Sequence, residues 1–270
     1  IVVDFSGSSE QRMNGLNCPY ASALGMTHYA VKALLSPELP QTDGCNRPID
    51  IIIPAGSVLN PREPAAASAR HLTQQAVADC VLKALLPFAP QTAAAGCQIS
   101  FPTMTLGGFD RRRSDTEPAY FVVADILGGG MGASASAPGL SGIDNHGSNC
   151  ALLSAEVMET VSPVRVVETA LVAGSGGHGR QRGGDGMRRS YEILCDGATL
   201  TGYIQQTRPE TAPWGVDGGG KGGLAVAEVS RADGTPVPLR SKFTGLRVDR
   251  GDVIKLTGAG GGGWGAAMPD

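Results

Sequence analysis

The sequence predicts an α+β protein, with helices mainly in the first third and glycine-rich antiparallel β segments in the second half. Helix-like patterns occur at residues 21–35 and 64–86, and short β-like runs recur between turn signals from about residue 155. In addition, 39 of the 270 residues are glycine, about twice the usual ~7%. The hydrophobic fraction of 41% is too high for a disordered linker, so the glycines are expected to serve turns and close backbone contacts in a folded domain.

The first third contains the helical patterns and two short strands. Residues 1–6 are expected to form a strand that ends in a small-residue turn, and residues 50–54 a short buried strand. Residues 21–35 predict a helix, which the following prolines end because proline disfavours a helical residue before it. The clearest helix is expected at residues 64–86, since Pro64 suits a first helical turn. Its predicted apolar face comprises Ala69, Leu72, Ala76, Cys80 and Ala84, with Val77, Val81 and Leu85 beside it.

The second half is expected to consist of short antiparallel strands. Residues 119–127 give the first clear strand pattern, and a glycine-rich loop follows at residues 128–139. Further β-like runs alternate with turn signals towards the C-terminus. The pairs Asp196-Gly197 and Asp233-Gly234 are typical of hairpin turns.

The organisation of the chain is expected to follow this change in character. We expect a mixed α/β part at residues 1–150 and a glycine-rich β part at residues 151–270, or one continuous domain. The chain opens on the strand-like run Ile1-Val2-Val3-Asp4-Phe5, and we expect an N-terminal half of the same subunit to lie upstream of it.

Composition argues against several classes of function. The formal net charge is −3 and the pI is about 5.8, which argues against nucleic-acid binding through a basic surface. No apolar run approaches the ~20 residues that span a bilayer, so no membrane association is expected. The six cysteines are scattered without a CxxC pair, which predicts reduced thiols, a cytoplasmic location and no cysteine-paired zinc site.

The segment at residues 174–189 is the first candidate for anion binding. A loop this rich in glycine can present several backbone N–H groups to a carboxylate or phosphate, and arginines can add bidentate contacts. It is not a phosphate-binding P-loop, because no GK[ST] follows the glycines. The alternative is a glycine-permitted bend between two strands, with solvated arginines. The candidate residues are Ser175, Gly176, Gly177, Arg180 and Arg182.

Two further glycine segments contain single candidate residues. In residues 213–223, Lys221 is positioned to face a phosphate or a carboxylate, or else to lie in an exposed turn. In residues 260–265, four consecutive glycines precede Trp264. This tryptophan is expected either to stack on a substrate or to anchor a tightly packed segment at a domain surface.

Metal binding and serine chemistry have weaker support. His146 and His178 lie in loops with Asp144 nearby in sequence, but no HxH, HxxxH or HExxH spacing accompanies them. We therefore assign no metal ligand in this chain. Ser175 as a nucleophile lacks both the G-x-S-x-G elbow and an assigned base, so no catalytic residue is assigned.

Five segments of the chain form a set whose order is informative. They are DFSGSSEQ with NGLNCP, the stretch around PAGSVLNPREPAA with the helix after it, AEVMETVSPVRVVETALVAGSGGHGRQRGGDGMRR, RPETAPWGVDGG and GGGGWG. Five ordered segments are far more specific than any one glycine motif. In this order they resemble the family that contains hydantoinase B, 5-oxoprolinases and the B-type subunits of acetone and acetophenone carboxylases. The resemblance covers nearly the whole chain and corresponds to the C-terminal half of such a subunit.

The resemblance implies part of an ATP-dependent cyclic amide hydrolase that works with a kinase-like A-type subunit through a phosphorylated intermediate. It implies ATP bound by that partner, a divalent metal in the upstream half, and a cyclic amide or ketone substrate. The chain alone is then expected to be inactive. Two alternatives stay open: a subunit of an ATP-dependent ketone carboxylase, and a non-catalytic structural half of such a complex. One departure is Gly174, where the family has an aspartate before Ser-Gly-Gly, which puts that contact in doubt.

Overall fold

The computed structural model describes residues 1–112, 114 and 116–267. The chain forms two compact units, residues 1–94 and residues 95–270, and each is described by itself. The division expected after residue 150 falls inside the second unit. Strand structure in this unit begins as early as Thr103, in a stretch whose sequence gave no strand pattern.

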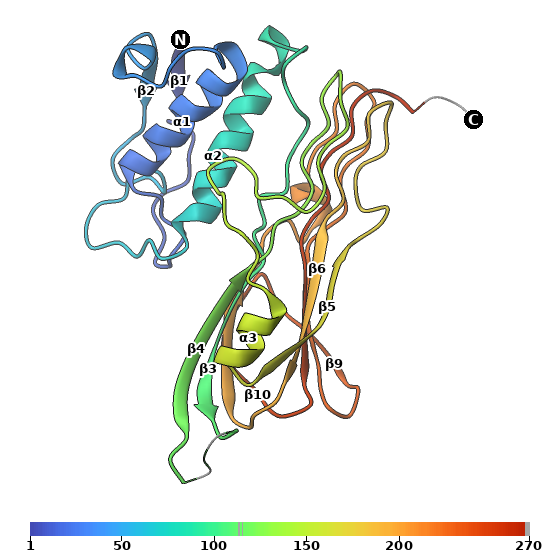
Figure 1. The fold of residues 1–270 in the computed structure, drawn as a ribbon. Helices are drawn as coiled ribbons and strands as arrows, with labels where there is room; N and C mark the ends of the chain where they lie inside the picture. Colours follow the sequence, from blue (N-terminus) through green and yellow to red (C-terminus); the bar gives the residue numbers. More distant parts are fainter. Residues whose placement is uncertain (113, 115, 268–270) are drawn as a thin grey trace. The chain divides into compact units, whose positions relative to one another are not determined.

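The first unit combines two helices with a small parallel strand pair (Figure 1). Strand β1 (Val2–Asp4) pairs in parallel with β2 (Asp50–Ile52), and helix α1 (Tyr20–Leu35) packs against α2 (Arg70–Leu85). Single 3₁₀ turns cover Asp43–Cys45 and Leu86–Phe88. The buried core of this unit comprises Cys18, Ala23, Met26, Ala30, Val31, Ile53, Leu59, Val77, Ala78 and Val81.

The first predicted helix is confirmed, and the second begins later than predicted. Residues 65–69 have helix-forming alanines, yet α2 starts only at Arg70. Tertiary hydrogen bonds hold this stretch in another conformation: the Asn17 side chain donates to the Ala66 carbonyl (2.8 Å), and the Ala69 N–H donates to the Gly15 carbonyl (2.8 Å). The predicted apolar face is correct at Leu72, Val77 and Val81 and wrong at Cys80 and Ala84, which are exposed.

The second unit contains two antiparallel sheets and helix α3 (Ala155–Val161), which packs on β5 and β4. One sheet has the order β10 (Lys242–Val248), β7 (Ala198–Tyr203), β3 (Thr103–Asp110) and β4 (Ala119–Ile126). The other has the order β5 (Val164–Leu171), β6 (Met187–Ile193), β11 (Val253–Thr257), β8 (Val226–Ser230) and β9 (Pro236–Pro238). A 3₁₀ turn covers Pro209–Thr211.

The two sheets pack face to face around one apolar core. Burial alternates along the strands, for example in β4 and β7, as expected for strands with one face in the core and one in solvent. The early helices and later antiparallel strands confirm the predicted α+β class. The core side chains that both sheets contribute include Met104, Leu106, Phe121, Val123, Tyr191, Ile193, Leu200, Val229, Ile254 and Leu256.

The two aspartate-glycine turns have different outcomes. Asp233-Gly234 joins β8 to β9, whose register pairs Ser230 with Pro236, so this hairpin is confirmed. Asp196-Gly197 joins β6 to β7, which lie in different sheets, so the predicted hairpin is wrong there. The turn passes the chain from one sheet to the other because β6 pairs with β5 and β11 instead.

No helix among the described residues is both long enough and apolar enough to cross a bilayer.

Candidate functional site

The candidate site residues lie in a bundle of glycine-rich segments that emerge from one end of the two sheets. We call these segments the glycine bundle. Figure 1 shows them running side by side beyond the strand ends, and backbone hydrogen bonds join them. They precede β3, β6 and β8 and follow β4 and β11, which is the same end of each antiparallel sheet. The segments are residues 95–98, 128–133, 174–186, 213–223 and 258–265.

The last segment lies at the centre of the glycine bundle and bonds to its neighbours in three directions. The N–H groups of Gly260 and Gly263 donate to residues 213–223, and those of Gly261 and Trp264 donate to residues 174–186. The N–H of Gly262 donates to Gly96 (2.8 Å). A β-strand would alternate between two sides. Here the direction of the hydrogen bonds repeats every three residues, from Gly260 to Gly263 and from Gly261 to Trp264. This repeat matches the three residues per turn of a polyproline-II helix.

Glycine is required because neighbouring backbones lie where a side chain would begin. A Cβ atom on Gly261 would overlap the Met131 carbonyl oxygen, and one on Gly262 would overlap the Trp214 carbonyl oxygen. Both carbonyl oxygens already accept a backbone hydrogen bond from another segment of the glycine bundle, Met131 from the Gly184 N–H and Trp214 from the Gly96 N–H. The glycine excess noted in the sequence is therefore largely a requirement of this packing.

Ser175, Gly176 and Gly177 lie inside the glycine bundle. The Gly177 N–H donates to the Gly261 carbonyl (2.8 Å), and the Gly176 N–H donates to the Asp185 carboxylate (2.8 Å). The Ser175 hydroxyl oxygen accepts from the Gly186 N–H (2.8 Å). These backbone donors are thus engaged within the protein, so anion binding through them requires a rearrangement and stays a prediction.

The three candidate cations lie on exposed positions of the same bundle. Arg182 forms an ion pair with Asp185 (2.9 Å), which places this guanidinium against a carboxylate of its own segment. The Arg180 guanidinium makes one long contact with the Ala135 carbonyl (3.4 Å), and the Lys221 ammonium donates to the Pro209 carbonyl (2.9 Å). Arg180 and Lys221 therefore keep most of their donors accessible to a ligand.

Trp264 is buried, with 2% of its surface exposed. The backbone N–H of Trp264 donates to the Gln181 carbonyl, and the backbone carbonyl of Trp264 accepts from the Gln181 N–H. Burial and backbone pairing are the features expected if Trp264 anchors a tightly packed segment. Stacking of Trp264 on a substrate stays a prediction. The neighbouring Gly265 has a φ of +75°, a conformation that glycine adopts without steric cost.

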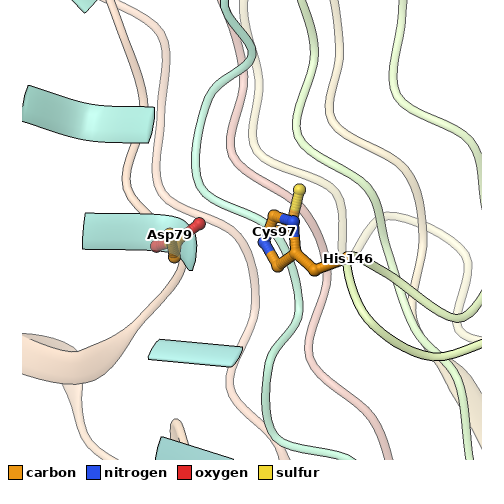
Figure 2. Close-up of side chains that lie close together, drawn as sticks. All are labelled: Asp79, Cys97 and His146. Atoms are coloured by element: carbon orange, nitrogen blue, oxygen red, sulfur yellow. The ribbon is translucent and has the colours of Figure 1, made fainter. Parts of the chain in front are cut away.

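The two loop histidines have different surroundings. His178 is exposed, its ring lies close to Gly220, and it belongs to no cluster of three or more metal-ligating side chains among the described residues. His146 instead lies beside Cys97, as Figure 2 shows, with the thiol sulfur and an imidazole nitrogen within 4.8 Å. Sequence spacing gave no hint of this pair, because 48 intervening residues, including β3 and β4, separate the two positions.

A buried polar cluster between the sheets was also missed from the sequence. Asp125 on β4 accepts from the Arg189 guanidinium (2.7 Å) and from the Tyr191 hydroxyl (2.9 Å), both on β6. Arg189 is 1% exposed and Tyr191 fully buried. Burial raises the pKa of the Tyr191 hydroxyl, so it stays a neutral hydrogen-bond donor to the carboxylate. The cluster links the two sheets.

The fold and the bundle together define a class of protein in which a β-sandwich continues into a glycine-rich, backbone-bonded extension. The chain belongs to the hydantoinase B/oxoprolinase family, whose model matches residues 1–267. A 5-oxoprolinase of Pestalotiopsis fici, PfmaA, is 33% identical over 100% of this chain and 21% of its own length. The chain spans less than half the length of the relatives it matches first.

Two solved structures share the fold. The ATP-dependent caprolactamase of Pseudomonas jessenii aligns with a TM-score of 0.83 at 22% identity, over 98% of this chain and 46% of that one. An acetone carboxylase in its nucleotide-free form aligns with a TM-score of 0.80 at 19% identity, over 98% of this chain and 39% of that one. At these identities the likeness shows a common fold.

Proposed function

We propose that this chain is part of an ATP-dependent cyclic amide hydrolase of the hydantoinase and 5-oxoprolinase type. The observation that carries the proposal is membership of the hydantoinase B/oxoprolinase family across residues 1–267. The identity to a 5-oxoprolinase over the whole chain supports ring opening of a lactam or hydantoin as the reaction.

The proposed mechanism explains why ATP is needed. An unstrained cyclic amide is a poor electrophile, and phosphorylation of its carbonyl oxygen makes the attached carbon more electrophilic. A kinase-like A-type subunit would bind ATP and transfer the phosphoryl group. Water would then add to the carbon, and the C–N bond of the ring would break as the nitrogen takes up a proton. A second water would hydrolyse the resulting acyl phosphate to a carboxylate and inorganic phosphate. Preorganised cations stabilise negative charge that develops during such steps. Arg180 and Lys221, with donors accessible on the glycine bundle, are two groups of this chain suited to hold the phosphorylated intermediate.

A second candidate function is that of a non-catalytic structural half. The observation that favours it is the engagement of the Gly176 and Gly177 N–H groups inside the glycine bundle. A rigid bundle of this kind would shape a surface for partner subunits while chemistry takes place elsewhere. A carboxylase subunit acting on a ketone remains the third candidate, supported by the fold shared with an acetone carboxylase.

The first experiment is native mass spectrometry of material purified from its source. We expect these residues to travel with the remainder of a B-type subunit, in the same or in a separate polypeptide, and with a kinase-like A-type subunit in the cytoplasmic fraction. The assembled complex should hydrolyse a cyclic amide with stoichiometric ATP consumption, and the isolated chain should show no turnover. Bicarbonate-dependent consumption of a ketone would favour the carboxylase instead. Full turnover by the isolated chain would refute the proposed division of labour.

A further inference from the structure

The Cys97 and His146 side chains form a pair of potential metal ligands within the second unit. Cys97 is buried, with 4% of its surface exposed, and its sulfur lies within 4.8 Å of a nitrogen of the His146 ring (Figure 2). Tetrahedral zinc with a thiolate and an imidazole ligand places the sulfur and nitrogen about 3.6 Å apart, from bond lengths of about 2.3 Å and 2.0–2.1 Å. The upper bound of 4.8 Å between the two atoms in this structure is compatible with this separation.

The segments that bear the two ligands are tied together by side-chain hydrogen bonds. The Asn145 amide donates to the Gln98 carbonyl (3.1 Å), which connects the residue before His146 to the residue after Cys97. The Gln206 amide donates to the Cys97 carbonyl (3.0 Å) and accepts from the Ile99 N–H (2.8 Å). Such outer interactions fix the positions of ligating groups and are a regular part of metal sites.

The sulfur itself also has a polar contact. The Gly132 N–H donates to the Cys97 sulfur (3.4 Å). Gly132 can make this approach because it lacks a Cβ, which would overlap the Ala95 carbonyl oxygen. The glycine bundle therefore presents a backbone donor to the Cys97 sulfur at this point.

His146 has a backbone conformation that needs support from its surroundings. Its φ is +52°, and non-glycine residues held in this region are strained and cluster at active sites and ligand clamps. The loop after it is fixed by the Asp144 carboxylate, which accepts from the Ser148 hydroxyl (2.9 Å) and the Cys150 N–H (2.7 Å). The loop thus holds the imidazole next to the thiol.

From this geometry we propose that Cys97 and His146 are ligands of a zinc-class divalent ion, a site separate from the anion-binding candidates. A thiolate with an imidazole selects borderline-soft ions such as Zn²⁺ over Mg²⁺. Binding forms a bond from the ion to the sulfur, and the thiol proton passes to solvent. The remaining positions of the ion are taken by water or other oxygen ligands.

The test is direct metal binding by the purified chain, without an activity assay. Equilibrium dialysis against Zn²⁺ with elemental analysis should give about one equivalent per chain. Co²⁺ in its place should give a thiolate-to-cobalt charge-transfer band in the near ultraviolet. Cys97→Ser and His146→Gln should each weaken binding at least about tenfold, since even loss of an outer-shell partner costs about 10–100-fold. Cys97→Ser should also abolish the charge-transfer band.

Two matched variants serve as controls. Cys150→Ser removes an exposed thiol close to His146 in sequence, and His178→Ala removes the exposed histidine of the glycine bundle; both should retain the ion and the band. Circular dichroism checks that each variant is folded. If Cys97→Ser fails to fold, the proposal is tested by His146→Gln alone. The unaltered chain should then show the charge-transfer band, and His146→Gln should lose it. The assignment would be overturned if the folded chain failed to retain Zn²⁺, or if both ligand variants retained as much Zn²⁺ as the unaltered chain.

Discussion

At the residue scale, local surroundings give the cysteines different reactivities. The Cys18 thiol is buried, which raises its pKa to about 11. The Cys45 thiol contacts the Thr42 hydroxyl (3.6 Å), and this hydrogen bond lowers its pKa below the ordinary value. Because the thiolate is the nucleophile, iodoacetamide at neutral pH should modify Cys45 quickly and Cys18 only after unfolding. Peptide mass spectrometry over time measures both rates.

The contribution of Thr42 can be separated from simple exposure. Thr42→Val should slow the alkylation of Cys45, whereas Thr42→Ser, which keeps the hydroxyl, should leave the rate near that of the unaltered protein. Equal rates in both variants would show that the hydroxyl has no influence on the thiol.

The buried Asp125–Arg189 pair predicts a large stability effect from a single substitution. Arg189→Met leaves the Asp125 carboxylate without its cation in a buried site, and breaking a buried pair in this way costs about 3–5 kcal/mol. Tyr191→Phe removes only one hydrogen bond to the carboxylate, which costs about 1.5–3 kcal/mol. Urea unfolding midpoints should rank the variants in this order. A smaller loss for Arg189→Met than for Tyr191→Phe would contradict the assigned role of the ion pair.

At the scale of elements, two glycine-to-alanine substitutions should act in opposite directions. In Gly261→Ala the added Cβ overlaps the Met131 carbonyl oxygen, so we expect a loss at or above the ~1–3 kcal/mol that overpacking usually costs. In Gly25→Ala the added Cβ meets nothing within 4 Å on helix α1. This change should stabilise the protein by about 0.5–1 kcal/mol, because alanine is the better helix former.

Thermal unfolding followed by circular dichroism measures both changes under the same conditions. Loss of stability in Gly25→Ala, or an unchanged melting temperature in Gly261→Ala, would contradict the packing described for the respective glycine.

How far the sequence predicts each element depends on whether its side chains or its backbone determine the structure. Helix α1 and strand β4 follow from side-chain periodicity and were predicted. Strand β3 was missed because Gly107-Gly108 interrupts its pattern, and β10 because Gly245, with a φ of +66°, lies in a register shift between Phe243 and Leu246. Helix α3 carries a regular signal that was overlooked, the cap at Ser154, whose hydroxyl accepts from the Val157 N–H (3.3 Å).

The glycine bundle could not be predicted in form. Its segments are held together by backbone hydrogen bonds, which do not depend on the identity of the side chain. The sequence therefore shows only that these positions are glycine, and not which segments pair. The same limit applies to the Cys97–His146 pair, whose partners meet only once the bundle and its flanking loops are folded. Residue types for these sites were visible in the sequence, whereas their pairing was not.

At the scale of the whole molecule, the catalytic and structural proposals differ in what the exposed cations do. Arg180→Ala and Lys221→Ala remove charges that make few contacts within the chain, so neither should change stability by more than about 0.5 kcal/mol. If these groups hold a phosphorylated intermediate, each substitution should lower kcat of the assembled complex about 100–1,000-fold, as loss of a charge-stabilising donor does. The amount of complex on size-exclusion chromatography should stay unchanged.

Arg182→Ala is the matched control for this comparison, because its guanidinium is already paired with Asp185 (2.9 Å) and an exposed pair contributes only about 0–1 kcal/mol. A lower yield of complex with a normal kcat per complex, in Arg180→Ala and Lys221→Ala, would instead indicate a docking role for the glycine bundle. The separation is possible because the two cations project from a scaffold that backbone hydrogen bonds hold rigid, so their removal tests the charge without altering the support beneath it.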